Sequence, residues 1–274
     1  MVALWRKRWV VAVALGLAAI TGGLGPLATP RLSRVTAPDE ALLVRVLVFN
    51  GSSGGLGDAD RASAMLLGAD ADVIVLLEPS TELLDVIRAS EEWTAQFPFR
   101  RLPDSAKAGW RVVFTRWPQR GGEEFAGGAE VAAAEGMHVM IVQRPAGAFG
   151  FVQFNPESPR TLARWRRGNV RVTEAIEAVR ERLLPREIPV LAAGDMNATG
   201  SGGRSRRFAR ESGLKRAKAW WTPRATYPAW LPGFVGIAID DVWASPEVKV
   251  VSWERLDPCG SDHRPVLVTL EVPR

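Results

Sequence analysis

The stretch IPVLAAGDMNA, Ile188 to Ala198, gives the strongest indication of the fold. Its apolar first part is typical of a β-strand that is buried on both faces. The strand is predicted to end in polar residues, Asp195 and Asn197, where a turn begins. A carboxylate at the end of a buried strand loses hydration, and a metal ion, a hydrogen-bonding partner or a cation normally offsets that cost. The same pattern at other strand ends would indicate one shared site.

Polar residues do recur at the ends of predicted strands, or inside them. They are Asn50, Glu78, Asn155, Asp195, Asn197, Asp240, Asp262 and His263. Any single one is more often a helix cap or a turn residue, but their repetition in one chain favours a shared site. Hard oxygen ligands with amides, one histidine and no thiol favour Mg²⁺ or Mn²⁺, with Ca²⁺ as an alternative, over zinc.

Strands and helices are predicted to alternate along the chain, which indicates one α/β domain over residues 41–274. Strands are predicted at 41–50, 72–79, 111–118, 138–145, 150–155, 188–197, 237–245, 248–256 and 265–272, and helices at 58–68, 80–89, 161–184 and 204–212. The segment 119–137 is predicted to be a loop. In the longest helix, helical spacing predicts an apolar face made of Trp165, Val172, Ile176, Val179 and Leu183. The arginines of this helix, and those of 204–210, are predicted to face solvent.

The N-terminus is predicted to be a secretory signal peptide or a signal anchor over residues 1–28, followed by a linker over 29–40. Three basic residues, Arg6 to Arg8, precede an uncharged apolar segment, Trp9 to Ala28. The basic flank predicts that the rest of the chain is exported or membrane-anchored outside the cytoplasm. Three of the five net positive charges of the chain lie within residues 1–28. The remaining chain is therefore only weakly basic, and its charge alone gives no strong case for binding nucleic acid. The single cysteine, Cys259, excludes a disulfide framework within the chain.

Several short motifs follow one another in a specific order, and together they resemble a known superfamily. They are FN (49–50), DVIVLLE (72–78), GDMNA (194–198), IDDVWAS (239–245) and SDHRPV (261–266). In this order the chain resembles the endonuclease/exonuclease/phosphatase superfamily, the DNase I-like proteins, from about Val44 to Val268. The weaker TYP (226–228) resembles a motif of a bacterial, often membrane-associated branch. The resemblance implies a four-layer α/β sandwich with two packed mixed β-sheets.

The resemblance also implies a role for each polar residue in a divalent-metal-dependent phosphoester hydrolase. Glu78 would be the principal metal ligand with Asn50 beside it, and Asp262 would help to hold the site or a second metal. Asp195 would position or deprotonate the attacking water, and Asn197 would hold that water or a phosphate oxygen. His263 would stabilise charge on the phosphoryl group, and Asp240 would orient that imidazole.

The substrate class stays open at this stage between nucleic acid, phospholipid and a small phosphoester. The N-terminal segment would attach the protein to a membrane if it is not cleaved, and no obligate protein partner is implied. The loop 222–236, with Trp230, Leu231 and Phe234, has the composition of an exposed loop. It fits a membrane-facing lip and equally a packed loop.

One expected residue differs from the superfamily pattern. In FVQFNPESPR, Phe151 to Arg160, the strand before the long helix ends in Asn155, where the family usually has a histidine. Asparagine donates a hydrogen bond but transfers no proton near neutral pH. The alternative function is therefore a catalytically degenerate binding module with the same fold. In either case Asn155 is predicted to lie in one pocket with Glu78, Asp195 and His263, and Asp241 is predicted to face away from Asp240.

Overall fold

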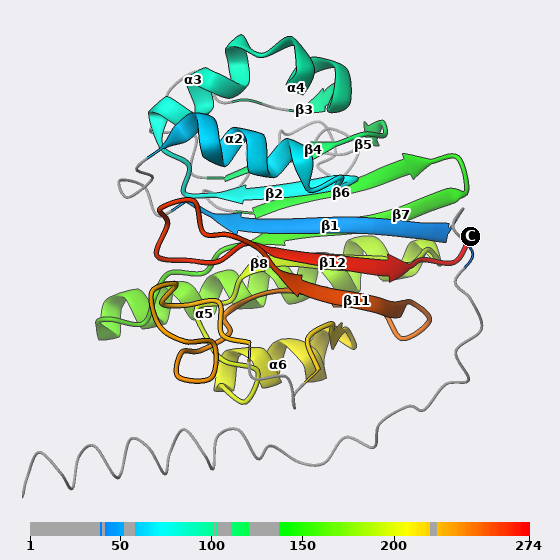
Figure 1. Cartoon of the computed structure of the whole chain (residues 1–274). Helices are drawn as coiled ribbons and strands as arrows, with labels where there is room; N and C mark the ends of the chain where they lie inside the picture. Colours follow the sequence, from blue (N-terminus) through cyan, green and yellow to red (C-terminus); the bar gives the residue numbers. More distant parts are fainter. Residues whose placement is uncertain are drawn as a thin grey trace, which may run out of the picture.

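Two six-stranded β-sheets pack face to face, and helices cover the outer face of each, in the computed structural model of the chain (Figure 1). The structure describes residues 39, 42–51, 58–100, 102, 111–120, 137–219 and 224–274. This four-layer α/β sandwich confirms the predicted fold class. The predicted signal or anchor segment, and all of the linker except Asp39, lie outside the described residues. Among the residues described, no helix has both the length and the apolar composition needed to cross a bilayer.

The first sheet has the strand order β11-β12-β1-β2-β4-β3. Its strands are β1 (Leu43–Asn50), β2 (Val73–Leu77), β3 (Phe99–Arg100), β4 (Arg111–Thr115), β11 (Lys249–Arg255) and β12 (Val266–Glu271). Only the central pair, β1 and β2, is parallel, with Asn50 opposite Leu77. All five residues of β2 are buried, as the continuous apolar run predicts. The carboxyl ends of β1 and β2 therefore lie at the same edge, where both arrowheads point in Figure 1.

The second sheet repeats this arrangement with the order β5-β6-β7-β8-β10-β9. Its strands are β5 (Gln119–Arg120), β6 (Met137–Arg144), β7 (Gly147–Phe154), β8 (Val190–Asp195), β9 (Lys215–Arg216) and β10 (Asp240–Ala244). The central pair β7 and β8 is again parallel, and β10 pairs antiparallel with β8 so that Asp240 lies opposite Asp195. Each sheet thus has two central strands whose carboxyl ends meet at one edge.

Helices pack on the outer face of each sheet. The first sheet is covered by α2 (Ala59–Gly68), α3 (Thr81–Ala89) and α4 (Glu91–Gln96), and the second by α5 (Leu162–Glu177) and α6 (Gly203–Ser212). Side chains cap the starts of α2 and α3, where Asp58 accepts from Arg61 N at 2.9 Å and Ser80 from Leu83 N at 3.2 Å. The helix α5 continues as a π-helix, Ala178–Leu183, and a 3₁₀ turn, Leu184–Arg186.

Several sequence predictions need correction. Trp165 does not belong to the buried face of α5, since 47% of its surface is exposed, whereas Val172 and Ile176 are buried as predicted. Arg204 does not face solvent, because it is 93% buried. The short elements α4, β3, β5 and β9 were not predicted, because two to six residues are too few to show a period. Of the predicted loop 119–137, residues 121–136 lie outside the described residues.

Candidate active site

Four of the predicted site residues lie where the central parallel strands of the two sheets end. Asn50 is the last residue of β1 and Asp195 the last of β8, while Glu78 and Asn155 directly follow β2 and β7. Two hydrogen bonds cross between the sheets here. Asn50 Nδ2 donates to Asp195 Oδ2 at 3.3 Å, and Asn155 Nδ2 donates to Glu78 Oε1 at 3.1 Å. The fold therefore gathers residues that are up to 145 positions apart in the sequence.

Asn197 connects these two cross-sheet contacts. Its backbone N–H donates to Asp195 Oδ1 at 2.6 Å, and its side-chain Nδ2 donates to the Pro156 carbonyl at 3.0 Å, with a weaker 3.5 Å contact to Asn155 Oδ1. Asn197 and Glu78 both have left-handed backbones, with φ of 49° and 46°. This conformation is uncommon for glutamate, and such residues cluster at functional sites. Asn155 is thus placed beside Glu78 and Asn197, while its predicted place in one pocket with Asp195 and His263 stays a prediction.

Gly194 lets β8 approach β7 closely just before Asp195. Its φ is +154°, and a Cβ at this position would overlap the carbonyl oxygen of Phe154. Phe154 is the residue before Asn155, so this close approach sets the distance between two of the site residues. Only glycine fits the backbone here, which explains the first residue of the GDMN motif.

Replacing Gly194 by alanine is therefore expected to destabilise the protein strongly, by about 3 kcal/mol or more, because the added methyl group forces the strands apart. Thermal unfolding measures the effect. The matched control is Gly68→Ala at the end of α2, where an added Cβ has no atom within 4 Å, so its melting temperature should change little or rise. Equal melting temperatures for the two variants would contradict this account of Gly194.

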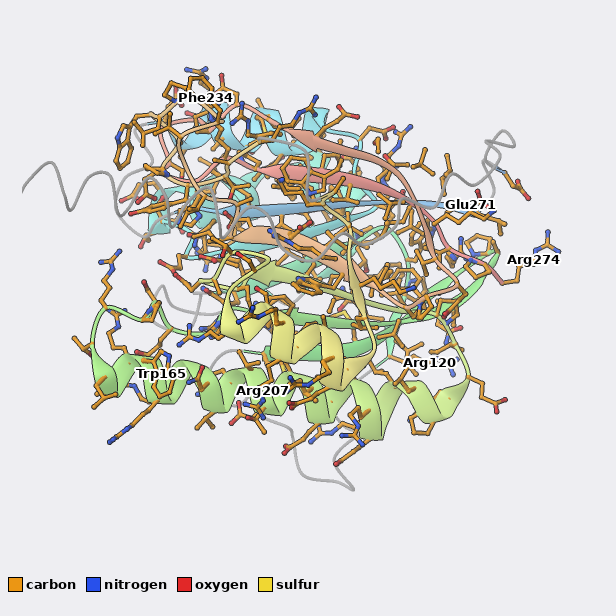
Figure 2. The ribbon with its side chains drawn as sticks, turned by 90° about the horizontal axis from the view of Figure 1, so that it is seen from below. Arg120, Trp165, Arg207, Phe234, Glu271 and Arg274 are labelled. Carbon is orange, nitrogen blue, oxygen red and sulfur yellow. The ribbon has the colours of Figure 1, made fainter. Side chains whose placement is uncertain are left out.

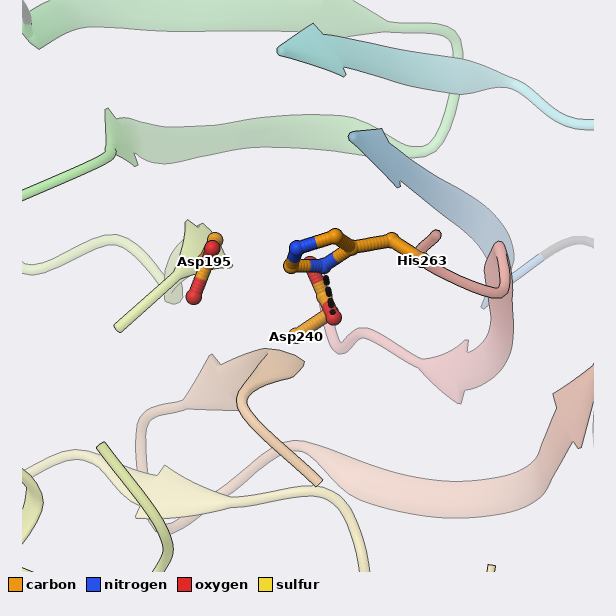
Figure 3. A group of neighbouring side chains, drawn as sticks. All are labelled: Asp195, Asp240 and His263. Carbon is orange, nitrogen blue, oxygen red and sulfur yellow. Dashed lines mark hydrogen bonds and ion pairs between the residues drawn. The ribbon is translucent and has the colours of Figure 1, made fainter. Parts of the chain in front are cut away.

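Asp240 and His263 form a buried pair next to Asp195. His263 Nδ1 lies 2.9 Å from Asp240 Oδ2 and 3.1 Å from Oδ1. One ligand atom from each of Asp195, Asp240 and His263 lies within 4.8 Å of the other two. Figure 3 shows the imidazole above the Asp240 carboxylate, with the dashed contact between them, and the Asp195 carboxylate to one side of the ring. The three groups come from β8, β10 and the loop before β12.

The pKa values of Asp195 and His263 are both raised in this cluster. Burial raises the pKa of Asp195 to about 7, with repulsion from Asp240 and Glu78 adding to it, while His263 and the Asn197 N–H oppose the shift. Burial also disfavours the imidazolium of His263, but attraction and hydrogen bonding by Asp240, with further attraction by Asp195, raise its pKa to about 9. Near neutral pH, His263 is therefore a cation held by Asp240, and Asp195 is poised to exchange a proton.

Neighbouring polar groups fix the positions of Asp240 and His263. Thr226 Oγ1 accepts hydrogen bonds from the backbone N–H groups of Ile239 and Asp240, at 3.1 and 3.3 Å. Ser261 Oγ donates to the Asn50 carbonyl at 2.7 Å and accepts from the His263 N–H at 3.0 Å. The histidine loop is thereby attached to the end of β1.

Asp262 and Asp241 lie differently around this pair. The structure gives no bond between the Asp262 side chain and another predicted site residue, among those described, although its charge helps to raise the pKa of His263. Asp241 faces away from Asp240 as predicted. It forms an ion pair with Arg216 and accepts from Trp253 Nε1 at 2.9 Å.

Sequence reasoning missed two arginines that hold the Asn155 loop. Arg111 Nη2 donates to the Asn155 carbonyl at 3.1 Å. Arg204 Nη1 donates to the Glu157 carbonyl at 2.7 Å, and its other donors bind Asn169 Oδ1 and the Trp165 carbonyl. Surface arginines look the same in a sequence, so no local signal distinguishes these two. Glu157 is also held by ion pairs with Arg164 and Arg167.

The donor set fits a divalent cation. Carboxylates and asparagine amides are hard ligands that suit Mg²⁺, Mn²⁺ or Ca²⁺. Burial, with repulsion from Asp240 and Glu78, raises the pKa of Asp195, and a bound cation would favour the ionised carboxylate. Nδ1 of His263 already binds Asp240, and one oxygen each of Asp195 and Asp240 lies within 4.8 Å of a ring nitrogen of His263, as in a group that could hold a metal ion.

Comparison with known proteins agrees with this geometry. The model of the Endonuclease/Exonuclease/phosphatase family matches residues 47–263, which span all of the predicted site residues from Asn50 to His263. No curated protein matches the sequence.

Solved structures share the fold at low sequence identity. The endonuclease/exonuclease/phosphatase from Beutenbergia cavernae DSM 12333 has a TM-score of 0.58 at 18% identity, covering 85% of this chain and 72% of its own. Sphingomyelinase C from Streptomyces griseocarneus has a TM-score of 0.54 at 14% identity, covering 83% and 99%. The human Nocturnin catalytic domain, solved with a bound sulfate anion, has a TM-score of 0.55 at 14% identity, covering 84% and 94%. At these identities the likeness shows the DNase I-like fold and no more.

Proposed function

Because this chain belongs to the endonuclease/exonuclease/phosphatase family, we propose that it is a divalent-metal-dependent phosphoester hydrolase. The observation that carries the proposal is the cluster of Asp195, Asp240 and His263, with one polar atom from each within 4.8 Å of the others. Asn50 donates to Asp195 at 3.3 Å, and the charge of Glu78 acts on the same carboxylate. Relatives in the fold include a sphingomyelinase and an endonuclease domain, which supports hydrolysis of a phosphoester without choosing the ester.

Each residue of the cluster has a role that its contacts support. Glu78 and Asn50 would hold Mg²⁺ or Mn²⁺, and the cation would supply positive charge to the phosphate. Asp195 would orient the attacking water and accept its proton, helped by the Asn197 N–H, which fixes the carboxylate at 2.6 Å. His263, held as a cation by Asp240 at 2.9 Å, would donate a hydrogen bond to the phosphoryl oxygen as charge develops there. Asp262 would contribute negative charge next to His263.

A panel of esters tests the proposal on the purified chain. DNA, a dinucleotide, phospholipid vesicles and a sugar phosphate are each incubated with Mg²⁺, Mn²⁺ or Ca²⁺. We expect hydrolysis of at least one ester that stops when the metal is chelated. Failure to cleave any of them with any of the ions would favour the alternative function, a degenerate binding module, which the asparagine at position 155 motivates.

Asn155 gives a sharper prediction about the leaving group. Its amide donates to Glu78 at 3.1 Å and cannot transfer a proton, so the protein lacks the acid that the family usually has there. Asn155→His is expected to raise kcat by about 10²-fold on esters with poorly acidic leaving groups and to leave p-nitrophenyl esters nearly unchanged. Initial rates across a series of leaving groups measure this dependence.

The matched control is Asn155→Gln, which enlarges the buried side chain equally without adding a proton donor of suitable pKa. Histidine and glutamine variants with the same rates, or a histidine effect that is independent of the leaving group, would show that Asn155 does not occupy the position of a missing acid.

Residues 1–28 remain proposed as a signal peptide or a signal anchor that places the catalytic domain outside the cytoplasm. The arrangement of three basic residues before an uncharged apolar segment supports this. The mass of the mature protein after expression in a secretion-competent host tests cleavage.

A further inference from the structure

A loop beside the candidate site exposes several large apolar side chains. In this segment, residues 227–237, here named the aromatic loop, Trp230 is 71% exposed, Phe234 77%, Val235 56% and Ile237 44%. Figure 2 shows Phe234 at the outer margin of the molecule, away from Trp165 on α5. Several large apolar side chains exposed on one short loop are unfavourable in water, and exposed apolar patches mark interaction surfaces in soluble proteins.

The aromatic loop is held in place by its own backbone. Tyr227 and Ile237 exchange two hydrogen bonds, of 2.9 and 2.7 Å, and Ala225 N donates to the Gly233 carbonyl at 2.8 Å. A Cβ at position 233 would overlap the Arg255 guanidinium, which packs against Gly233. The exposed side chains are therefore presented by an ordered, closed loop.

The aromatic loop is also attached to the candidate site. The Tyr227 ring lies 4.8 Å from the His263 imidazole, centroid to centroid. Ala229 N donates to the Asp262 carbonyl at 2.7 Å, and Arg264 Nη2 donates to the Ala229 carbonyl at 2.8 Å. Whatever binds the aromatic loop is thereby brought next to His263.

Positive charge lies at the base of the aromatic loop. Arg224, Arg255 and Arg264 donate to the carbonyls of Trp253, Ala225 and Ala229, and no carboxylate pairs with any of the three among the residues that the structure describes. Burial, with the neighbouring charges of Arg264 and Arg224, lowers the pKa of Arg255. The surface thus combines an apolar tip, made of the exposed side chains of the aromatic loop, with three nearby arginines that form no ion pair among the described residues.

We propose that the aromatic loop docks the candidate site onto an anionic lipid bilayer, so that the substrate is the phosphoester of a lipid headgroup. The substrate part of this inference rests on the proposed function. Apolar side chains at the tip would enter the acyl boundary while the three arginines bind lipid phosphates.

Two other occupants fit the surface less well. Single-stranded nucleic acid would stack on aromatic rings, but Val235 and Ile237 offer no ring and account for half of the exposed apolar side chains. A symmetric second copy would place this patch against an identical patch, because a two-fold interface uses the same surface on both subunits, so six arginines would share one interface.

The test compares two double variants of the full chain on vesicles. Phe234→Ser with Val235→Ser, the tip variant, removes two of the four exposed apolar side chains of the aromatic loop, while Leu162→Ser with Trp165→Ser, the α5 variant, removes an exposed aromatic and aliphatic pair from α5. Both keep residues 1–28, so that segment contributes equally to each. Binding is measured on vesicles of phosphatidylcholine containing phosphatidylglycerol. The rate on phosphatidylglycerol in those vesicles is divided by the rate on bis(p-nitrophenyl) phosphate.

The tip variant is expected to lose at least about tenfold in vesicle affinity and in this rate ratio, while the α5 variant keeps both. A second measurement uses Phe234→Cys and Leu162→Cys, each with an environment-sensitive dye. Anionic vesicles should shift the emission of the first only. Equal losses in both double variants, or no shift at Phe234→Cys, would overturn docking.

Further outcomes separate the occupants and the two proposals. Concentration-dependent dimerisation lost only in the tip variant, or single-stranded DNA binding lost only there without a change on vesicles, would also overturn docking onto lipid. If the wild-type protein hydrolyses none of the esters but still binds vesicles through its tip, docking stands and the proposed function fails. If it hydrolyses the soluble ester but the tip variant is unaffected on vesicles, the proposed function stands and docking fails.

Discussion

Replacing Asp195 by asparagine is expected to lower kcat by about 10³- to 10⁴-fold at pH 8, with a fold that is as stable as before. Burial raises the pKa of this carboxyl to about 7, so at pH 8 it is ionised and can accept a proton from water, which an amide cannot. Stability should hold or increase, because the repulsion between Asp195 and its neighbours Asp240 and Glu78 is removed. Initial rates and thermal unfolding on the same preparation measure both effects.

Asp241→Asn is the matched control for this variant. Asp241 is also a buried strand carboxylate, but it faces Arg216 and Trp253 instead of the site. Its replacement leaves the partly buried Arg216 unpaired and should cost about 3 kcal/mol of stability without changing kcat at low temperature. If the Asp195 variant instead loses stability and keeps its rate, Asp195 is structural and the proposed function is wrong.

Replacing Asp240 by asparagine is expected to move the alkaline limit of activity to lower pH and to lower kcat by about 10²-fold. Asp240 holds the His263 imidazolium at 2.9 Å and is the main attraction that raises its pKa to about 9. The pKa of His263 is higher in the folded protein than in the unfolded chain, so the imidazolium persists below about pH 9 and is lost as the pH rises through that value. Without the charge of Asp240, burial still lowers the pKa of His263, and the imidazolium therefore loses its proton at a lower pH.

Proton NMR titration measures this pKa directly. The chain has only two histidines, and a His138→Gln variant assigns their signals. The His263 pKa is expected near 9 in the wild-type protein and lower in Asp240→Asn, while Asp241→Asn leaves it unchanged. An unchanged His263 pKa in Asp240→Asn would contradict the assigned partnership.

Much of the fold was predictable because long elements show a clear period and clear caps. β2 lies within a continuous apolar run, and Asp58 and Ser80 stand at the predicted helix starts. The site was predictable for a related reason. Buried strands that end in polar residues bring them together when parallel strands share an edge, as Asn50 and Glu78 show at the ends of β1 and β2.

The rest depends on contacts that only the packed structure creates. Arg204 looks like a surface arginine in the sequence, but packing of α6 against the Glu157 loop buries it. Trp165 has the spacing of a core residue, yet 47% of its surface is exposed. Residue type and helical spacing do not determine whether either side chain is buried or exposed, because the same sequence pattern is compatible with both.

The local sequence around Asn155 shows only that a strand ends before a proline. The structure adds its contacts, with Glu78 on the other sheet and with Asn197. Whether an asparagine there slows proton transfer to the leaving group is what the leaving-group series decides.

The most direct measurement of the central claim is the rate at which metal-stripped wild-type protein hydrolyses bis(p-nitrophenyl) phosphate as Mn²⁺ is restored. We expect no turnover without metal, a saturable return of activity with Mn²⁺, and no return in Asp195→Asn at any concentration. A rate that does not depend on the metal, or a wild-type protein no faster than Asp195→Asn at saturating Mn²⁺, would contradict that claim.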